Sequence, residues 1–286
     1  MPAQIIDGKQ LAQSIRLEIK AKTQEFTNRT GIQPGLATVL VGQDPASQVY
    51  VRNKHKACAE VGFYSEAHEL SDTATAEELV ALVQKLNKDS KIHGILVQLP
   101  LPKHIPESVA IDAIIPEKDV DGIHPASIGN LVLGKAGFVA CTPAGVMRLI
   151  DSTGIELKGK HAVVVGRSNI VGKPLSLLLL ARHATVTICH SRTQDLGAVT
   201  RSADVLCVAV GKAKLIKGDM VKPGAVVIDV GTNRNEEGKL VGDVDFESVV
   251  PVASAITPVP KGVGPMTITM LLWNTLQAAE SFAVEK

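Results

Sequence analysis

The predicted helix that follows Ser47 carries one lysine on an otherwise apolar face. At about 100° per residue, that face consists of Tyr50, Val51, Lys54, Ala57, Cys58 and Val61. A buried ammonium group is unstable unless it is paired or loses its proton, so Lys54 is a candidate for proton-transfer chemistry, with Tyr50 one helical turn away. The alternative interpretation is that Lys54 extends its amine past the edge of the stripe into water.

A second chemical pattern is a glycine turn between a predicted strand and a predicted helix. Residues 163–174 read Val-Val-Val-Gly-Arg-Ser-Asn-Ile-Val-Gly-Lys-Pro. Gly166 permits a tight turn, Gly172 permits close packing of helix on strand, and exposed amides at the helix start would face a pyrophosphate. Ser168 stands where such turns usually have their middle glycine, so the pattern by itself does not decide the function.

The residues after the next predicted strand distinguish NADP from NAD. An NAD site usually has an acidic residue there, which binds the ribose 2′-hydroxyl. This chain has Ser191 and Arg192 instead, and Arg167 lies in the glycine turn. Two guanidinium groups and a hydroxyl suit a 2′-phosphate, so NADP is the predicted cofactor. The alternative is two solvated surface arginines beside an unrelated turn.

Composition argues against several classes of partner. The 286 residues carry a net charge of +1 and only 3% aromatic residues, which disfavours nucleic acid and an anionic membrane surface. The N-terminus lacks the long apolar core of a secretion signal, and the apolar run near 175–181 is too short to cross a bilayer. Four scattered cysteines and eight histidines show no metal-ligand spacing, so we expect reduced thiols, a cytoplasmic location and no metal.

Strands and helices are predicted to alternate along the chain. Short apolar or β-branched runs predict strands at 36–41, 63–70, 92–98, 162–165, 186–189, 205–210, 225–230 and 253–256. Helices are predicted from the capping pair Asp7 and Gln10 to Arg29, from an N-cap at Ser47, from Thr75 with Glu78 to Lys88, and over 265–283.

This alternation predicts an α/β protein of two domains with parallel-type sheets. Right-handed crossovers place the ligand-binding crevice at the carboxyl ends of the strands. Small residues cluster between Gly134 and Thr142, which marks the expected boundary. We therefore expect residues 1–138 and 267–286 to form one domain, onto which the C-terminal helix packs back. Residues 139–266 are expected to form a Rossmann-like NADP-binding domain, with a cleft between the two.

Six segments spread over almost the whole chain form a further pattern. They are YVRNK at 50–54, GILVQLPLP at 94–102, KDVDG at 118–122, CTP at 141–143, VGRSNIVGKP at 165–174 and GVGPMT at 262–267. Together they resemble the bifunctional methylenetetrahydrofolate dehydrogenase/methenyltetrahydrofolate cyclohydrolase family. The resemblance implies NADP-dependent oxidation of 5,10-methylenetetrahydrofolate, then hydrolysis to 10-formyltetrahydrofolate in the same active site. It also implies a homodimer and a place in one-carbon metabolism and purine biosynthesis.

The resemblance assigns roles by position. It implies that Lys54 is the catalytic lysine, Tyr50 its companion, Gln98 the residue that holds the lysine amine, and Asp121 the carboxylate that binds the pterin. The implied substrate-binding residues are Tyr50, Val97, Gln98, Leu99, Pro100, Asp121, Gly264 and Pro265. The implied NADP-binding residues are Gly166, Arg167, Ser168, Ile170, Gly172, Ser191, Arg192 and Thr232. The simpler alternatives are a turn-forming aspartate for Asp121 and a polar strand end for Gln98.

Three positions depart from the family pattern, and two rival functions stay open. Thr232 replaces a common Ile, Lys261 a usual Gly and Ser127 a frequent Asn. None is in the implied catalytic set, so we expect effects on affinity rather than on reaction type. The rivals are another two-domain NADP dehydrogenase, acting on a carbocyclic or keto acid, and a non-enzymatic dinucleotide-sensing module. The sensing module would need no ionisable residue on the helix that carries Tyr50.

Overall fold

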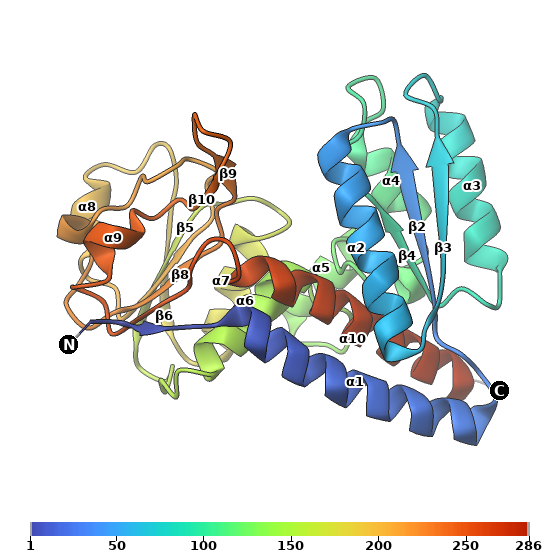
Figure 1. Cartoon of the computed structure of the whole chain (residues 1–286), viewed down its shortest axis with the longest axis horizontal. Helices are drawn as coiled ribbons and strands as arrows, with labels where there is room; N and C mark the ends of the chain where they lie inside the picture. The colour runs from blue at the N-terminus through green and yellow to red at the C-terminus, as the bar shows by residue number, and fades with distance from the viewer. Residues whose placement is uncertain (1, 285–286) are drawn as a thin grey trace. The chain divides into compact units, whose positions relative to one another are not determined.

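The computed structural model describes residues 2–284 and divides into two compact units. The three-strand unit comprises Ser14–Cys141 and the chain from Ile268, and the six-strand unit comprises the chain up to Gln13 and Thr142–Thr267. Each unit is named here by its main sheet, in which all strand pairs are parallel. The predicted two-domain α/β fold is confirmed (Figure 1).

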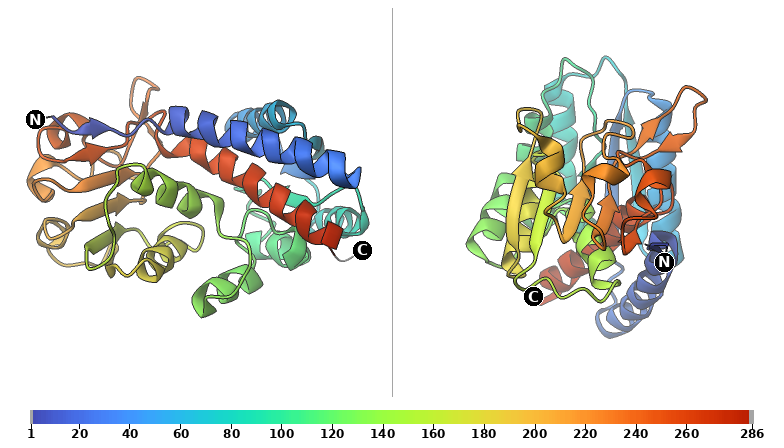
Figure 2. Two further views of the ribbon diagram at one scale, coloured as in Figure 1. Left: turned by 90° about the horizontal axis from the view of Figure 1, so that it is seen from below. Right: turned by 90° about the vertical axis from the view of Figure 1, so that its left-hand side faces the viewer.

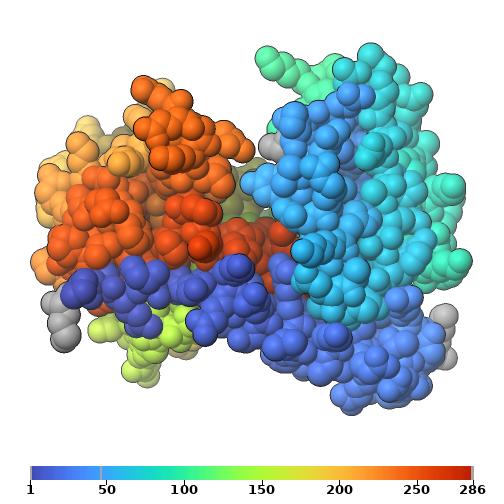
Figure 3. Space-filling model, in the orientation of Figure 1, coloured from blue at the N-terminus to red at the C-terminus, as the bar shows by residue number. Residues whose placement is uncertain are grey.

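The observed units differ from the expected domain boundaries at the N-terminal strand. β1 (Gln4–Ile5) pairs in parallel with β11 (Ala255–Ile256) at the edge of the six-stranded sheet. The N-terminal segment, blue in Figure 3, lies at the surface against the orange part of this unit. The chain up to Gln13 therefore belongs to the six-strand unit, whereas residues 1–138 were expected together in the other domain. A two-residue strand is too short to give a periodic signal, and its partner lies near the opposite end of the chain.

The sheet of the three-strand unit has the order β3-β2-β4. Its strands are β2 (Gly35–Val41), β3 (Tyr64–Leu70) and β4 (Gly94–Val97). Side chains alternate between its faces, and Ala37, Val39 and Ile95 pack with α3 (Ala76–Lys88) and α4 (Glu107–Ala113) in one apolar core. The opposite face lies under α2 (Pro45–Val61), and Figure 1 shows α2 and α3 on the two sides of this sheet.

Helix α2 begins earlier than predicted. The N-cap is Asp44 rather than Ser47, because the Asp44 carboxylate accepts a hydrogen bond from Ser47 N at 2.8 Å and Pro45 occupies the first turn. The helix ends at Gly62, whose φ of 84° favours glycine. The predicted stripe is buried at Val51, Lys54, Ala57, Cys58 and Val61. Its first member, Tyr50, is 47% exposed.

Two long helices cross the division between the units. α1 (Gly8–Thr30) starts after Asp7, whose carboxylate accepts a hydrogen bond from Gln10 N as predicted. α10 (Val263–Val284) is close to the predicted helix over 265–283. Figure 2 shows the two helices side by side, and Arg16 Nε on α1 donates to Thr269 Oγ1 on α10 at 3.0 Å. The short η1 (Pro116–Lys118) and α5 (Pro125–Leu133) were not predicted.

The six-stranded sheet has the order β1-β11-β8-β7-β5-β6. Its other strands are β5 (His161–Val165), β6 (Thr185–Cys189), β7 (Val205–Val208) and β8 (Val226–Asp229), which confirms the predicted strands there. Its helices are α6 (Cys141–Asp151), α7 (Gly172–Ala181), α8 (Leu196–Thr200), η2 (Gly218–Met220) and α9 (Phe246–Val249). β5 lies between β6 and β7, so the winding of the sheet reverses at β5, where α/β sheets bind ligands. The hairpin of β9 (Asn233–Arg234) and β10 (Leu240–Val241) was not predicted.

Candidate active site

The centre of the candidate site is a buried lysine. Lys54 is 9% exposed, and its Nζ donates a hydrogen bond to Gln98 Oε1 at 2.7 Å. Gln98 follows β4 two residues after Leu96, which pairs with Thr38, so its side chain points to the face that α2 covers. This burial excludes the alternative in which Lys54 extends freely into water.

The carboxylate of Asp121 acts on the pKa of Lys54. Burial lowers the pKa of Lys54, and the negative charge of Asp121 opposes this by raising it. Burial raises the pKa of Asp121, and the charge of Lys54 and a hydrogen bond from Cys141 lower it. The amine therefore gives up its proton more readily than a solvated lysine does, which is the property that a proton-transfer group needs.

The loop that carries Asp121 is held by a residue of the C-terminal helix. Asn274 Nδ2, buried on α10, donates to the carbonyl oxygens of Val120 at 2.8 Å and Val139 at 3.0 Å. Cys141 N donates to Asp121 O at 3.3 Å, which ties the same two segments together. Asn274 was not predicted as a site residue, because its partners are two backbone carbonyls more than a hundred residues away.

A second aspartate shapes the turn after Asp121. Asp119 is buried, and its carboxylate accepts hydrogen bonds from Ile123 N at 3.3 Å, His124 N at 2.9 Å and Ser127 Oγ at 2.6 Å. Burial raises the pKa of Asp119, and these donors lower it. Asp119 was also missed, although it shares the KDVDG segment with Asp121. An aspartate followed closely by glycine and potential backbone donors was the available signal.

The other predicted substrate residues of the three-strand unit flank Gln98 or Lys54. Gln98 Nε2 donates to Leu99 O at 2.6 Å, and Pro100 beyond it is exposed. The side chain of Val97 belongs to the apolar core with α3, on the face opposite to Gln98, so only its backbone is available on the Lys54 side. The Tyr50 side chain forms no hydrogen bond with another described residue, which leaves its hydroxyl free for a ligand or water.

The predicted cofactor turn lies at the carboxyl end of β5. Gly166 has φ 128°, and a Cβ there would lie 2.2 Å from Ala209 O. A Cβ on Gly172 would lie 2.2 Å from Gly166 O, so both glycines are required by close backbone approach. Ser168, which replaces the middle glycine, has a role of its own. Its Oγ accepts hydrogen bonds from Val171 N at 3.2 Å and Gly172 N at 3.3 Å, where α7 begins.

The groups expected to bind a 2′-phosphate are exposed around this turn. Arg167, Ser168 and Ile170 are exposed in the turn, and Ser191 and Arg192 are exposed after β6. Neither guanidinium forms an ion pair with a described carboxylate, and β6 is not followed by an acidic residue in the next five positions. Two unpaired cations and a hydroxyl fit a nucleotide that carries the extra phosphate.

Two buried aspartates hold the loops after β7 and β8, where Thr232 lies. Asp229 accepts hydrogen bonds from the backbone nitrogens of Gly231, Asp243 and Val244, each at 2.9 Å. Asp243 accepts from four donors: Val210 N, Gly211 N, Lys212 N and Asn233 Nδ2. Burial raises the pKa of Asp229 to about 7. Sequence analysis missed both residues, since their partners come from separate loops.

Comparisons with known proteins agree along the whole chain. Residues 6–121 match the tetrahydrofolate dehydrogenase/cyclohydrolase catalytic domain, and residues 140–283 match the corresponding NAD(P)-binding domain. The bifunctional protein FolD of Moorella thermoacetica is 64% identical over 279 residues, covering 98% of this chain and 99% of the relative. The crystal structure of the Campylobacter jejuni FolD enzyme has a TM-score of 0.96 at 52% identity, covering 98% of this chain and 99% of that one. The Trypanosoma brucei FolD, solved with NADP and an inhibitor, has a TM-score of 0.95 at 41% identity, covering 99% of each chain.

The chain belongs to the tetrahydrofolate dehydrogenase/cyclohydrolase family. It is an NADP-dependent methylenetetrahydrofolate dehydrogenase and a methenyltetrahydrofolate cyclohydrolase, which confirms the activity and the cofactor predicted from the sequence. Its substrates are tetrahydrofolate derivatives. Neither rival function, the carbocyclic or keto-acid dehydrogenase or the sensing module, is favoured by identities of this size.

The three departures from the family pattern have distinct structural settings. Lys261 has φ 84°, a conformation that favours glycine, so the side chain is held in a strained backbone. Ser127 donates to Asp119, and Thr232 is exposed beside the loop that Asp243 braces. Gly264 and Pro265, at the first turn of α10, belong to the six-strand unit.

Residues 2–284 contain neither a metal-binding cluster nor a membrane-spanning helix. No group of three or more His, Cys, Asp or Glu side chains in this range is arranged to hold a metal ion. No helix in the same range is both long enough and apolar enough to cross a membrane.

The Arg167→Ala variant tests the 2′-phosphate assignment. A charge-assisted hydrogen bond contributes about 1.5–3 kcal/mol, so the variant is expected to raise KM for NADP by about 10- to 100-fold. KM for NAD should change by less than about threefold, because NAD lacks the phosphate. Initial-rate kinetics with both cofactors measure this. Arg29→Ala, which removes the same charge from the end of α1 in the other unit, is the control and should leave both constants unchanged. Equal increases for both cofactors would contradict the assignment.

Proposed function

We propose that Lys54 transfers protons in the cyclohydrolase reaction and that Tyr50, Gln98 and Asp121 complete its site. The observation that carries the proposal is the burial of Lys54 against a single amide oxygen. A neutral amine there can accept a proton from water and return it later. Gln98 Oε1 fixes the direction of Nζ by accepting one of its hydrogens.

The proposed hydrolysis needs only one residue, Lys54, to accept a proton and return it. Water attacks the methenyl carbon between the two folate nitrogens, forming a C–O bond, and its proton passes to the Lys54 amine. The resulting ammonium gives a proton to N5 as the bond between this carbon and N5 breaks, and the second hydrogen of the water leaves to solvent. The formyl group remains on N10. Tyr50, one turn away on α2 with a free hydroxyl, is placed to hydrogen-bond this water.

Asp121 is proposed to bind the pterin. Its carboxylate accepts hydrogen bonds, as the amino and ring N–H groups of a pterin require. The contacts of Asn274 and Cys141 hold the loop around it, so the acceptor is fixed before substrate binds. The backbone of Val97, together with Leu99 and Pro100, is proposed to line the same substrate site. Gly264 and Pro265, in the six-strand unit, are also proposed to bind substrate.

The dehydrogenase reaction uses the cofactor groups of the six-strand unit. When bound, NADP accepts the hydride from the methylene carbon. The amides at the start of α7 and the glycines at 166 and 172 are proposed to bind its pyrophosphate. Arg167, Ser191 and Arg192 bind the 2′-phosphate, and Ile170 and Thr232 contact the nucleotide from their exposed loops.

We also infer a homodimer and a cytoplasmic location. β3 is an edge strand with no partner on one side among the described residues, and exposed edges of this kind are commonly covered by another chain. Light scattering of the purified protein should give twice the chain mass at micromolar concentration, and a mass of one chain would refute the dimer.

The cytoplasmic location is inferred from the cysteines. All four are buried and form no disulfide, which fits a reducing compartment. Fractionation of the source cells should place the protein with cytoplasmic markers rather than with membranes.

The Lys54→Met variant tests the proposed function directly. General acid–base catalysis contributes about 10²- to 10⁴-fold, so cyclohydrolase kcat should fall by at least about a hundredfold. Binding of NADP, followed by fluorescence, should be unchanged, since the cofactor residues lie in the other unit. Lys56→Met is the matched control, because Lys56 is exposed on the same helix and should tolerate the change. Normal cyclohydrolase turnover in Lys54→Met would refute the role of Lys54.

The Asp121→Asn variant tests the charge coupling through the pH profile. The negative charge of Asp121 raises the pKa of Lys54, so removing it should lower that pKa further. Because the neutral amine is the active form, the rising limb of cyclohydrolase kcat/KM should move to lower pH, although the maximum falls as folate binding weakens. Profiles of both proteins at one ionic strength measure the midpoint. An unchanged or higher midpoint would show that Asp121 does not act on Lys54.

A further inference from the structure

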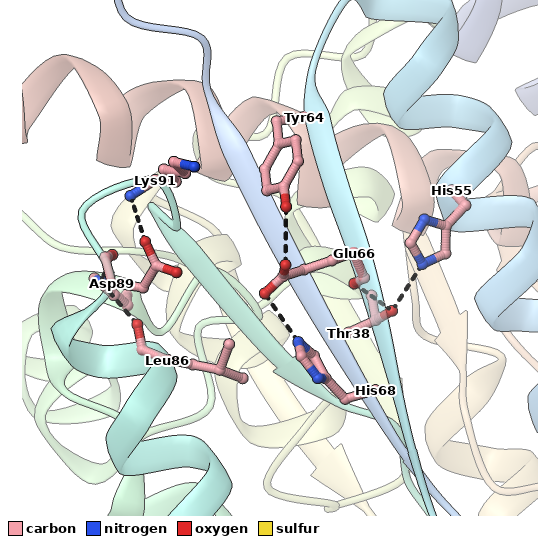
Figure 4. Close-up of polar contacts among 9 residues, drawn as sticks. Thr38, His55, Tyr64, Glu66, His68, Leu86, Asp89 and Lys91 are labelled. Carbon is pink, nitrogen blue, oxygen red and sulfur yellow. Dashed lines mark hydrogen bonds and ion pairs between the residues drawn. The ribbon is translucent and has the colours of Figure 1, made fainter.

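A chain of hydrogen bonds lies between α2 and the sheet beside the catalytic lysine. His55 Nε2 is 3.1 Å from Thr38 Oγ1 on β2, and His55 Nδ1 is 2.9 Å from Ser65 Oγ on β3. Figure 4 shows the His55 ring directed at Thr38, which in turn contacts the backbone carbonyl of Glu66. Thr38 is 1% exposed, so this is a polar contact inside the helix–sheet interface.

The bonds in this chain point in one direction. The Thr38 hydroxyl donates to Glu66 O, so Thr38 Oγ1 accepts from His55 Nε2–H. His55 Nδ1 then accepts from the Ser65 hydroxyl. Every member is satisfied when the imidazole is neutral, and burial lowers the pKa of His55, which favours that form.

His55 and Lys54 together fix α2 at three strands. Lys54 bonds to Gln98 after β4, whereas His55, the next residue, bonds to β2 and β3. The sheet order is β3-β2-β4, so Lys54 is held at one edge of the sheet, and His55 is held at the central strand and the other edge. Most of the other buried side chains of α2 are apolar, and apolar packing resists small rotations of a helix less than directional hydrogen bonds do.

We propose that His55 is a positioning residue for Lys54: through Thr38 and Ser65 it sets the rotation of α2 on the sheet and so keeps Lys54 Nζ on Gln98. The proposal rests on the proposed function of Lys54. A shift of about 1 Å at a reacting group can reduce a rate by about a hundredfold. His55 therefore affects catalysis without touching the substrate.

The test compares two His55 variants with a matched histidine. His55→Leu removes both bonds, while His55→Gln retains a donor and an acceptor on one side chain. His68→Leu is the control, because His68 bonds to Glu66 on the opposite face of the same sheet, as Figure 4 shows. For each protein, cyclohydrolase kcat and KM, the pH midpoint of kcat/KM, NADP affinity and the thermal midpoint are measured.

The expected result is a loss in kcat with little change in KM. His55→Leu should lower cyclohydrolase kcat by about tenfold or more. It should move the pH midpoint upward, because an amine released from its buried position regains a higher pKa. His55→Gln should stay within about threefold of the parent protein, and His68→Leu should match it. If His55→Leu lowers only the thermal midpoint, with the kcat and the pH midpoint of the parent, the positioning role is wrong.

Two further measurements keep the outcome decisive. Should His55→Leu not fold, Thr38→Val and Ser65→Ala each remove one of the two His55 bonds with little change in shape. Thr38→Val also removes the bond to Glu66 O, and each variant should lower kcat in the same direction. Added to Lys54→Met, His55→Leu should cause no further loss of cyclohydrolase activity. Normal turnover in Lys54→Met alone would refute the proposed function. If His55→Leu keeps the cyclohydrolase kcat of the parent protein while Lys54→Met loses activity, only the positioning role is refuted.

Discussion

The structure of the site depends on keeping one ammonium-forming group inside an apolar helix–sheet interface. Among the described residues, Lys54 has one hydrogen-bond partner, Gln98, and it forms no ion pair with its carboxylate neighbour Asp121. Burial therefore outweighs the attraction between the two charges, and the pKa of Lys54 is lowered. Full pairing with a buried carboxylate would have held the proton on the amine and prevented its use as a base.

The loops proposed to hold ligands in both units are organised by buried carboxylates. Asp119 orders the turn after Asp121, and Asp229 and Asp243 order the loops after β7 and β8. Each carboxylate accepts several backbone N–H groups that no strand or helix satisfies. No buried side-chain nitrogen or oxygen among the described residues lacks a hydrogen-bond partner. Irregular loops are thus held rigid without apolar cores of their own, which is what the positioning of a ligand requires.

Periodic features could be predicted from the sequence, and contacts between distant segments could not. The burial of Lys54 followed from its place on the α2 stripe, and the buried strands followed from their β-branched runs. The contacts of Asn274 with Val120 and Val139 had no local signal. The sequence around an asparagine in an apolar helix does not indicate which distant backbone groups it will bind. β1 was missed because two residues have no period. Ser47 and Asp44 are both residue types that cap helices, and the structure uses Asp44, which stands three residues earlier and is followed by Pro45.

The balance that sets the charge of Lys54 also indicates how substrate should act on it. In the proposed hydrolysis the methenyl substrate is a cation and binds near Lys54, and a neighbouring positive charge disfavours a second one. Pterin N–H groups bound to Asp121 also weaken the negative potential that raises the pKa of Lys54. Both effects add to burial, so the amine is most strongly driven to its neutral form when the substrate that needs a base is present. In the dehydrogenase step the folate is neutral, and a protonated Lys54 is then no obstacle to hydride transfer. One lysine can therefore serve a site that handles both substrates without a change of structure.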